Sequence, residues 1–432
     1  MRLLVVGNGA REHAIVWKLS KSNKKPEIFV APGNAGTETI AINVPIELDD
    51  IENLLEFAKG NQIDLTIVGP EIPLVKGIVN DFSNAGLRIF GPTKEAALIE
   101  GSKSFSKQIM NSAGAPTAPF SIFDNYYQAK EYILEKGAPI VIKADGLAAG
   151  KGVVVAQSVD EALGALHAMM VERIFGTSGD RVVIEDCLSG PEVSVFCFTD
   201  GSNISSLVAA CDYKRAYDDN KGPNTGGMGG YSPPSWWNAK FEKLIRETCI
   251  KPVIDQMALM GCPYSGILYG GLMLTEQGPS IIEFNARLGD PEAEFILPRL
   301  ENDLIEVIDA LLNGDLNKLE LKWEDNYIVG VVLASGGYPG KYEIDLPIHG
   351  LKNTLNLGQV FHAGTRSNNG ETYTAGGRVL TAIGKATTMK EARINAYKLV
   401  EKINFENMQY RTDIAQFAND EKVNKEKETP IA

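Results

Sequence analysis

A glycine-rich loop between two apolar segments carries the strongest chemical signal in this sequence. Residues 141–155 read VIKADGLAAGKGVVV, with Lys143 before the loop and Lys151 near its far end. The β-branched runs on both sides predict paired antiparallel strands. Glycines let the backbone approach a ligand, and exposed N–H groups and lysines bind oxygen atoms, which is typical of a flap over a polyphosphate. The alternative is a surface hairpin with solvated lysines.

A second segment has the residue types of a metal site. Residues 281–292 read IIEFNARLGDPE, in which Glu283 and Asn285 are two apart and so face the same side of a strand. Arg287 continues that face if the strand persists. Two oxygen donors beside an arginine suit Mg²⁺ that bridges phosphates. A buried Glu–Arg pair is the alternative, although the turn at 288–291 exposes this end of the strand.

A third segment has the pattern of a hinge between two subdomains. Residues 181–195 read RVVIEDCLSGPEVSV, a strand that ends at Glu185 and restarts at Glu192 after a short linker. Backbone groups in such a linker can pair with an adenine edge, and the second carboxylate can accept ribose hydroxyl protons. Taken alone, the segment fits a simple hairpin equally well.

The first glycine loop, GNGAREH at residues 7–13, follows a strand and opens a helix. It begins like a dinucleotide fingerprint, but Glu12 replaces the third glycine and Ala31-Pro32 ends the second strand, which disfavours NAD. A helix N-terminus still offers N–H groups to an anion, and Arg11 and Glu12 can reach ribose or phosphate. A tight turn is the alternative.

A polar stretch at 212–232, DYKRAYDDNKGPNTGGMGGYS, is predicted as a long loop whose N–H groups face an anionic substrate. Upstream, residues 1–101 alternate apolar runs with helical stretches, which predicts a parallel sheet covered on both faces. Ligands of such sheets bind at the carboxyl ends of the strands. The predicted strands of this sheet span residues 3–6, 28–31, 65–69 and 87–91.

Composition restricts the class of protein. The chain has 432 residues with 44% hydrophobic and 22% charged content, and its net charge of −13 argues against a nucleic-acid binder. The first residues do not have the pattern of a signal peptide, and no apolar run is long enough for a membrane span, so we expect a cytoplasmic protein. The five cysteines and four histidines show no metal-ligand spacing, which disfavours zinc and disulfides.

The order of the flap, hinge and metal strand is the layout of the ATP-grasp ligases. Nearly end to end, the chain also resembles the phosphoribosylamine–glycine ligase family, the glycinamide ribonucleotide synthetases. The shared motifs are GNGAREHA, APGNAGT, DLTIVGPEIPLVKGI, IFGPTKEAALIEGSK, PIVIKADGLAAGKGV, KGPNTGGMGGYSP, EFNARLGDPE, ASGGYPG and FHAGT…GGRVL. Two small departures, GGYSP for GAYSP and NARLGD for NCRFGD, remove no polar group.

The resemblance implies an α/β fold of three parts. We expect an N-terminal Rossmann-like (pre-ATP-grasp) domain at 1–101 and an ATP-grasp core at 102–326 with a mobile glycine-flap subdomain at about 119–188. A C-terminal α+β domain is expected at 327–424. The implied reaction is ATP-dependent ligation of glycine to 5-phosphoribosylamine through glycyl phosphate, which yields glycinamide ribonucleotide, ADP and phosphate in de novo purine biosynthesis.

The resemblance also implies roles for individual residues. The cofactors are ATP and Mg²⁺ (or Mn²⁺), with the metal on Glu283 and Asn285. The expected nucleotide-binding residues are Lys103, Lys143, Lys151, Gly152, Glu185, Leu188 and Glu192. The expected substrate-binding residues are Gly9, Arg11, Glu12, Asn34, Glu71, Asp212, Lys214, Arg287 and Arg378. The residues expected to be catalytic are Arg287, Lys143, Lys151 and Asp290.

We expect small-molecule substrates, no nucleic acid and no membrane partner. We further expect a monomer, compatible with a transient contact with the amidophosphoribosyltransferase that supplies phosphoribosylamine. Three alternatives stay open: an ATP-grasp ligase for another acid and amine, a non-catalytic nucleotide sensor, and a dehydrogenase. The joint presence of Glu283, Asn285, Lys143, Lys151 and Arg287 speaks against the sensor.

Overall fold

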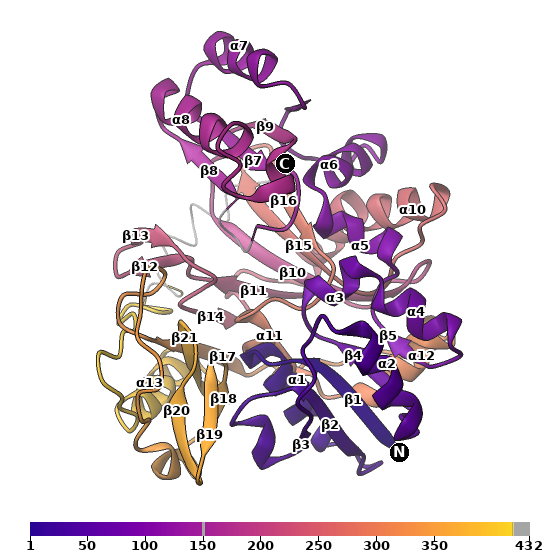
Figure 1. Cartoon of the computed structure of the whole chain (residues 1–432), viewed down its shortest axis with the longest axis vertical. Coiled ribbons are helices and arrows are strands. Elements are labelled where there is room, and N and C mark those ends of the chain that lie inside the picture. The colour runs from indigo at the N-terminus through magenta and orange to yellow at the C-terminus, as the bar shows by residue number, and fades with distance from the viewer. Residues whose placement is uncertain (149–151, 417, 419–432) are drawn as a thin grey trace.

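The structure is a computed structural model that describes residues 1–148, 152–416 and 418. Figure 1 shows an N-terminal parallel sheet, a central antiparallel sheet that continues into the C-terminal part, and a small unit with α7 and α8 that projects at the far end. Within the described ranges, no helix is both long and apolar enough to cross a lipid bilayer.

The N-terminal sheet is parallel with strand order β3-β2-β1-β4-β5, as predicted from the alternating pattern. Its strands are β1 (Arg2–Gly7), β2 (Glu27–Pro32), β3 (Ile42–Asn43), β4 (Leu65–Val68) and β5 (Ile89–Phe90). Its helices are α1 (Ala10–Ser20), α2 (Ile51–Gly60), α3 (Glu71–Lys76), α4 (Ile78–Asn84) and α5 (Lys94–Gly101). The strand order reverses beside β1, so the loop after Gly7 lies at the switch point where such sheets bind ligands.

The projecting unit is a four-stranded antiparallel sheet of order β6-β9-β7-β8. Its elements are β6 (Phe120–Phe123), α7 (Tyr126–Lys136), β7 (Ile140–Ala144), β8 (Val153–Ala156), α8 (Val159–Met170) and β9 (Val182–Asp186). The predicted pairing of the two valine-rich runs is confirmed, because Lys143 opposes Val153 across β7 and β8. A separate apolar core, which includes Ile133 and Leu166, holds the helices on this sheet.

The central sheet has eight strands in the order β16-β15-β10-β11-β14-β17-β21-β18. These strands are β10 (Glu192–Asp200), β11 (Val208–Asp212), β14 (Gly229–Ser232), β15 (Ser265–Thr275), β16 (Gly278–Asn285), β17 (Tyr327–Ala334), β18 (Gln359–His362) and β21 (Arg378–Ala386). The sheet passes directly from β14 to β17, so the core and the C-terminal part share one hydrogen-bonded ladder.

Helices cover this sheet on both sides (Figure 1). They are α6 (Lys103–Ser112), α9 (Ala239–Ile245), α10 (Lys251–Leu259), α11 (Glu292–Ile296), α12 (Leu304–Leu312) and α13 (Met389–Val400). A π-helical turn, Arg246–Ile250, separates α9 from α10 in one continuous helical stretch. Pro252 explains the interruption, because it has no N–H group to donate to the carbonyl of Thr248.

The prediction of a long loop at 212–232 was wrong. The stretch forms a hairpin of β12 (Arg215–Tyr217) and β13 (Lys221–Asn224), and its glycine-rich end is the sheet strand β14. Asp219 and Asn220 make the hairpin turn with φ values of 58° and 53°, a left-handed pair that these two residue types tolerate. Arg411 also supports the hairpin, because its Nη1 donates to Arg215 O and to Asn220 Oδ1.

Candidate active site

Two buried lysines share one carboxylate where the projecting unit meets the central sheet. Nζ of Lys107, on α6, lies 2.8 Å from Oε2 of Glu185, and Nζ of Lys143, on β7, lies 2.8 Å from Oε1 of the same residue. Lys107 also donates to Thr117 Oγ1 at 2.6 Å. Burial lowers the pKa of Lys107 to about 8, although Glu185 opposes the shift. This arrangement concentrates positive charge at one end of β9.

The expected metal strand is β16, and a bulge shapes it. Gly271 opposes Glu283 and Leu272 opposes Ile281, so Ile282 falls outside the ladder. The carbonyl of Ile282 instead accepts a hydrogen bond from Lys143 Nζ at 3.2 Å. The bulge therefore ties the β7 lysine to the strand that carries the expected metal ligands.

The donor set on β16 fits a divalent cation. Glu283 and Asn285 are both half-buried, whereas Phe284 between them points into the core. Burial tends to raise the pKa of Glu283, but Lys214, Lys143, Lys103 and Arg287 together lower it, so the carboxylate is ionised. In the described part of the chain, no group of three or more His, Cys, Asp or Glu side chains is placed to hold a metal ion. Two protein oxygens are enough for Mg²⁺, which usually keeps water and phosphate ligands as well.

The start of the flap is tied to α6. Asp145, two residues after Lys143, accepts hydrogen bonds from Ser102 Oγ and from the backbone and hydroxyl groups of Ser104. Nζ of Lys103 donates to the carbonyl of Gly146 at 3.2 Å, and the carbonyl of Gly152 accepts from Ala144 N at 2.8 Å. Lys151 lies outside the described residues. The expected phosphate ligands therefore lie around one flap base, with Lys143 and Lys107 more deeply buried than Lys103.

The hinge follows β9 and leads into β10. Leu188 is half-buried in this linker, and Glu192 at the start of β10 pairs with Lys214 at 3.0 Å. Gly190 adopts φ +147°, and a Cβ there would lie 2.1 Å from the carbonyl oxygen of Leu274. The linker therefore packs tightly against β15. The carboxylate of Glu185 faces the two lysines, and its role beside adenine stays a prediction.

Asp212 and Lys214 lie at the end of β11, near the metal strand. Burial raises the pKa of Asp212 to about 7, although Lys214 opposes the shift. The pKa of Lys214 is raised, first by Asp212 and further by Tyr269, Glu192 and Glu283. Lys214 therefore stands between the hinge carboxylate and the β16 carboxylate.

Arg287 reaches from the end of β16 to the N-terminal part. Its guanidinium lies 3.2 Å from Glu71 Oε2 on α3 and 2.5 Å from Glu100 Oε1 on α5. Burial tends to lower the pKa of Arg287, but Glu100 and Glu71 raise it. Burial tends to raise the pKa of Glu71, but Arg287 and Arg11 lower it to about 2. Arg287 therefore joins two acidic side chains of the N-terminal part to the metal strand.

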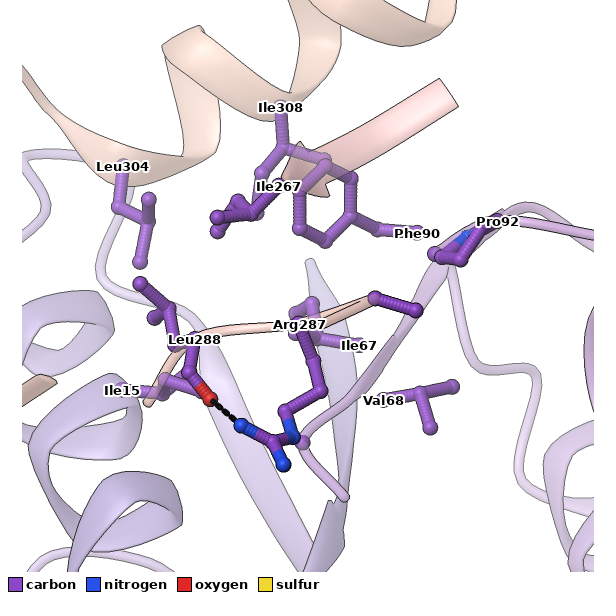
Figure 2. A pocket seen from close by; sticks show the side chains of 13 residues that line it. Ile15, Ile67, Val68, Phe90, Pro92, Ile267, Arg287, Leu288, Leu304 and Ile308 are labelled. Carbon is purple, nitrogen blue, oxygen red and sulfur yellow. Dashed lines mark hydrogen bonds between the residues drawn. The ribbon is translucent and has the colours of Figure 1, made fainter. Parts of the chain in front are cut away.

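Figure 2 shows a small apolar cavity on the inner side of Arg287. Its volume of about 20 Å³ is enough for roughly one water molecule. The N-terminal sheet and the core both contribute to its wall, which includes Ile15, Ile67, Phe90, Ile267, Leu288, Leu304 and Ile308. The aliphatic stem of Arg287 covers the cavity while the guanidinium bonds the carbonyl of Leu288 at its edge (Figure 2).

The GNGAREH loop is held by Glu12. Its carboxylate accepts from Gly9 N at 2.6 Å and from Arg11 Nε at 2.5 Å, and the side chain is almost wholly buried. Gly69 makes room for it, because a Cβ at that position would lie 2.1 Å from Glu12 Oε1. Glu12, at the position of the missing third glycine, thus makes the N3 half of a capping box, because it accepts from the N–H of the N-cap residue Gly9. Its contact with substrate stays a prediction, as does that of Arg11, which donates to Leu288 O.

Arg378, at the start of β21, meets the turn after the metal strand. Its Nη2 lies 2.9 Å from Asp290 Oδ1, and its Nη1 donates to the carbonyls of Asp290 and Gly226, each at 2.7 Å. Glu292, two residues after Asp290, accepts from Ser194 Oγ and Tyr269 Oη. The structure thus brings together three segments that the sequence singled out separately: the GGMGG stretch, the GDPE turn and the C-terminal GGR.

Three side chains at this site are absent from the sequence-based set: Lys107, Glu100 and Glu292. Lys107 follows Lys103 by four residues, which places both lysines on one face of α6 and was the available signal. Glu100 accepts from Ala286 N and pairs with Arg287, contacts between segments nearly 190 residues apart that no local pattern encodes.

Comparison with known proteins covers nearly the whole chain. Family models described as phosphoribosylglycinamide synthetase match the N domain at residues 1–100, the ATP-grasp (A) domain at 101–293 and the C domain at 328–417. A phosphoribosylamine–glycine ligase from Caldanaerobacter subterraneus subsp. tengcongensis is 50% identical over 96% of this chain and 99% of its own length. The protein of that name from Escherichia coli O157:H7 is 46% identical over 96% of this chain and 98% of its own length.

Solved structures agree. The crystal structure of phosphoribosylamine–glycine ligase from Thermotoga maritima superposes with a TM-score of 0.84 at 34% identity, over 96% of this chain and all of that one. The biotin carboxylase domain of Hydrogenobacter thermophilus 2-oxoglutarate carboxylase, solved with MgADP and bicarbonate, gives a TM-score of 0.74 at 15% identity, over 98% of this chain and 95% of that one. The second likeness shows the fold alone. With three matching domain models in order and relatives that share about half of its residues, the chain belongs to the phosphoribosylglycinamide synthetase family.

Proposed function

We propose that this chain joins glycine to 5-phosphoribosylamine at the expense of ATP, forming glycinamide ribonucleotide, ADP and phosphate. The observation that carries the proposal is the single cluster at the end of β16. There, Glu283 and Asn285 share a face with Lys143, Lys214 and Arg287 around them. Relatives named phosphoribosylamine–glycine ligase at 46–50% identity point to the same reaction.

ATP would bind between the projecting unit and the central sheet. Lys107 and Lys143 lie where phosphate oxygens can replace part of their contact with Glu185. We assign Lys103, Lys151 and Gly152 to the flap side of the phosphates, and Glu185, Leu188 and Glu192 to the adenine and ribose. A protein of the same fold was solved with MgADP, which supports a nucleotide in this fold.

Glu283 and Asn285 would hold Mg²⁺ or Mn²⁺. The bound cation would supply charge neutralisation between phosphate oxygens. Around it, Lys214 and Lys143 keep Glu283 ionised and so ready to bind a cation.

The chemistry has two steps. A glycine carboxylate oxygen attacks the γ-phosphorus of ATP, so the bond to ADP breaks and glycyl phosphate forms. The amine nitrogen of phosphoribosylamine then attacks the acyl carbon, loses a proton and expels phosphate. Both steps need positioning and charge stabilisation rather than a covalent nucleophile. Arg287 would contact the glycine carboxylate or the transferred phosphoryl group, with its geometry fixed by Glu71 and Glu100.

Phosphoribosylamine would bind between the N-terminal loops and the C-terminal part. Gly9, Arg11, Glu12, Asn34 and Glu71 lie on the loops and first helical turns that follow the parallel strands, next to the turn at 288–291. Arg378 would contact the distal phosphate, and Asp290, which it pairs with, would orient the amine. Asp212 and Lys214 complete the substrate side near the metal strand.

We also propose the domain division at 1–101, 102–326 and 327–424, with the flap subdomain at about 119–188. A monomer in the cytoplasm, with transient contact with the amidophosphoribosyltransferase, completes the proposal. Size-exclusion chromatography with light scattering tests the oligomeric state.

The deciding experiment measures ADP release with phosphoribosylamine generated in place, with and without glycine. ADP that appears only when glycine and the amine are both present would support the ligase. ADP release that does not depend on glycine, from folded protein that binds ATP, would contradict glycine as the acid and retain only the ATP-grasp assignment.

A further inference from the structure

The main chain of His362, in the C-terminal part, is hydrogen-bonded to two side chains of the N-terminal part. Its backbone N–H donates to Nδ1 of His13 on α1 at 2.8 Å. Its carbonyl oxygen accepts from Nδ2 of Asn34 at 2.8 Å. Both side chains are at least 95% buried. Two N-terminal side chains therefore hold the end of β18 from its donor side and its acceptor side.

The same two residues also hold the GNGAREH loop, Asn34 through its side chain and His13 through its backbone. Asn34 Nδ2 donates to the carbonyl of Asn8 at 2.9 Å and to that of Gly9 at 3.3 Å. His13 is in the first turn of the helix that this loop opens, and its N–H donates to Gly9 O at 3.1 Å. The two residues that bind His362 therefore also contact the loop directly.

On the other side of His362, a short path leads to Arg378. His362 pairs with Leu380 across β18 and β21, and Gly364 N donates to the carbonyl of Arg378 at 2.9 Å. Arg378 is the residue assigned above to the distal phosphate, and Gly9 and Arg11 are assigned to the same substrate. Two sides of the proposed phosphoribosyl site are therefore connected through His13 and His362.

The surroundings of His13 keep its ring fixed. The ring packs edge-on against Phe361 with centroids 5.5 Å apart, and Gly36 lies so close that a Cβ there would be 2.3 Å from His13 Cε1. An Nδ1 atom that accepts a hydrogen bond must be unprotonated, and burial together with His362 lowers the pKa of His13 accordingly. The side chain therefore acts as a fixed hydrogen-bond acceptor.

We propose that His13 is a positioning residue for the phosphoribosyl substrate. By holding His362, it sets the distance between the Gly9–Arg11 loop and Arg378, and so controls affinity for phosphoribosylamine and for glycinamide ribonucleotide. ATP and glycine bind elsewhere and are independent of it. This inference rests on the proposed function, because it needs the phosphoribosyl site to lie between these two segments.

The test compares two variants of His13 that differ in the position of the side-chain atom that can accept the hydrogen bond from His362 N–H. His13→Asn keeps an oxygen close to the position of Nδ1, whereas His13→Gln moves its oxygen one bond further out. Glycinamide ribonucleotide, which is stable, serves as the calorimetric ligand, and steady-state KM values are measured for ATP and glycine. His167→Leu, on the half-exposed side of α8, is the control for loss of a histidine.

We expect His13→Gln to weaken glycinamide ribonucleotide binding about tenfold or more, with the KM for ATP and glycine changed less than twofold. His13→Asn should restore binding to within about threefold of wild type. Equal binding by wild type and His13→Gln, or a parallel loss of ATP and ribonucleotide affinity, would overturn the positioning role alone. Failure of the wild-type protein to bind glycinamide ribonucleotide would instead overturn the proposed function.

Discussion

The ammonium group of Lys107 lies 2.8 Å from the carboxylate of Glu185, and both side chains are almost wholly buried. The pair stands at the base of the flap, where the same carboxylate also contacts Lys143. A buried charge of this kind is costly unless it is paired, so the carboxylate stabilises two cations that would otherwise repel each other. The arrangement holds both lysine side chains in place before a polyanion arrives.

Lys107→Met should therefore raise the KM for ATP by about 10- to 100-fold, because a hydrogen bond to a charged group contributes roughly 1.5–3 kcal/mol. The matched control is Lys240→Met, since Lys240 is an exposed lysine at the start of α9. We expect a change below about threefold in that variant. Initial-rate kinetics with varied ATP compare the two lysines, and an equal KM for ATP in wild type and Lys107→Met would contradict this assignment.

Glu283→Gln should reduce kcat by about 100-fold or more, because a metal that stabilises transition-state charge contributes several kcal/mol. The amide keeps the shape of the side chain but loses the charge that four basic side chains stabilise. Electron paramagnetic resonance of Mn²⁺ with ATP gives a readout that does not require turnover, and should show weaker binding. Glu276→Gln, on an exposed turn of the same hairpin, is the control and should behave as wild type. Unchanged Mn²⁺ affinity in Glu283→Gln would rule out the metal role.

Glu294 makes stability depend on pH. It is fully buried, and neither of its carboxylate oxygens has a hydrogen-bond partner among the described residues. Burial, with Asp290 adding to it, raises the pKa of Glu294 well above its ordinary value of 4.5. The folded protein therefore keeps this carboxyl group neutral. The contribution of the raised pKa to folding stability is fully present below pH 4.5 and is lost as the pH rises toward the folded-state pKa.

Glu294→Gln removes that titration. The melting temperature of the variant relative to wild type should rise steadily from pH 5 to pH 8, since each pH unit in this window changes stability by up to about 1.4 kcal/mol. Thermal unfolding at several pH values measures it. Glu306→Gln, exposed on α12, is the control for the change of charge. A difference that stays constant with pH would show that Glu294 is ionised in the folded protein.

Leu288→Ala should destabilise the protein by roughly 2–5 kcal/mol, because it enlarges an existing cavity in a wall that joins two parts of the molecule. The side chain is only 4% exposed, and its backbone carbonyl, which bonds Arg11 and Arg287, is retained. Leu259→Ala, at an 82% exposed position, should change stability by less than about 0.5 kcal/mol. Equal denaturation midpoints for the two variants would show that the cavity wall relaxes without loss.

Local pattern was sufficient for the strands that are buried on both faces. The runs before Gly7, Pro32 and Gly69 are continuous apolar segments, and each is a strand of the parallel sheet. β3 was missed because it has only two residues and Ile42 is exposed. The hairpin within 212–232 was missed because its strands are polar and depend on Arg411, almost 200 residues later.

The metal strand could be predicted from the period of two alone, since Glu283 and Asn285 need only be on one strand to share a face. The contacts that hold the site residues in place could not be predicted from the sequence. Two such pairs are Glu100 beside Arg287 and His13 beside His362. Their members lie on elements that are far apart in the chain, and their spacing in sequence carries no signal. Which of the two α6 lysines, Lys103 or Lys107, contacts Glu185 depends on how α6 is rotated against β9. The helical spacing of the two residues does not determine that rotation.

The shared ladder between β14 and β17 has a practical consequence for anyone who wishes to divide this chain. A fragment that stops before residue 327 would leave β14 as an unprotected edge, with backbone groups of Gly230 and Ser232 that now bond β17 open to intermolecular pairing. We expect such a fragment to aggregate on expression. A cut in the linkers beside the projecting unit, whose apolar core is its own, offers the better starting point for an isolated fragment.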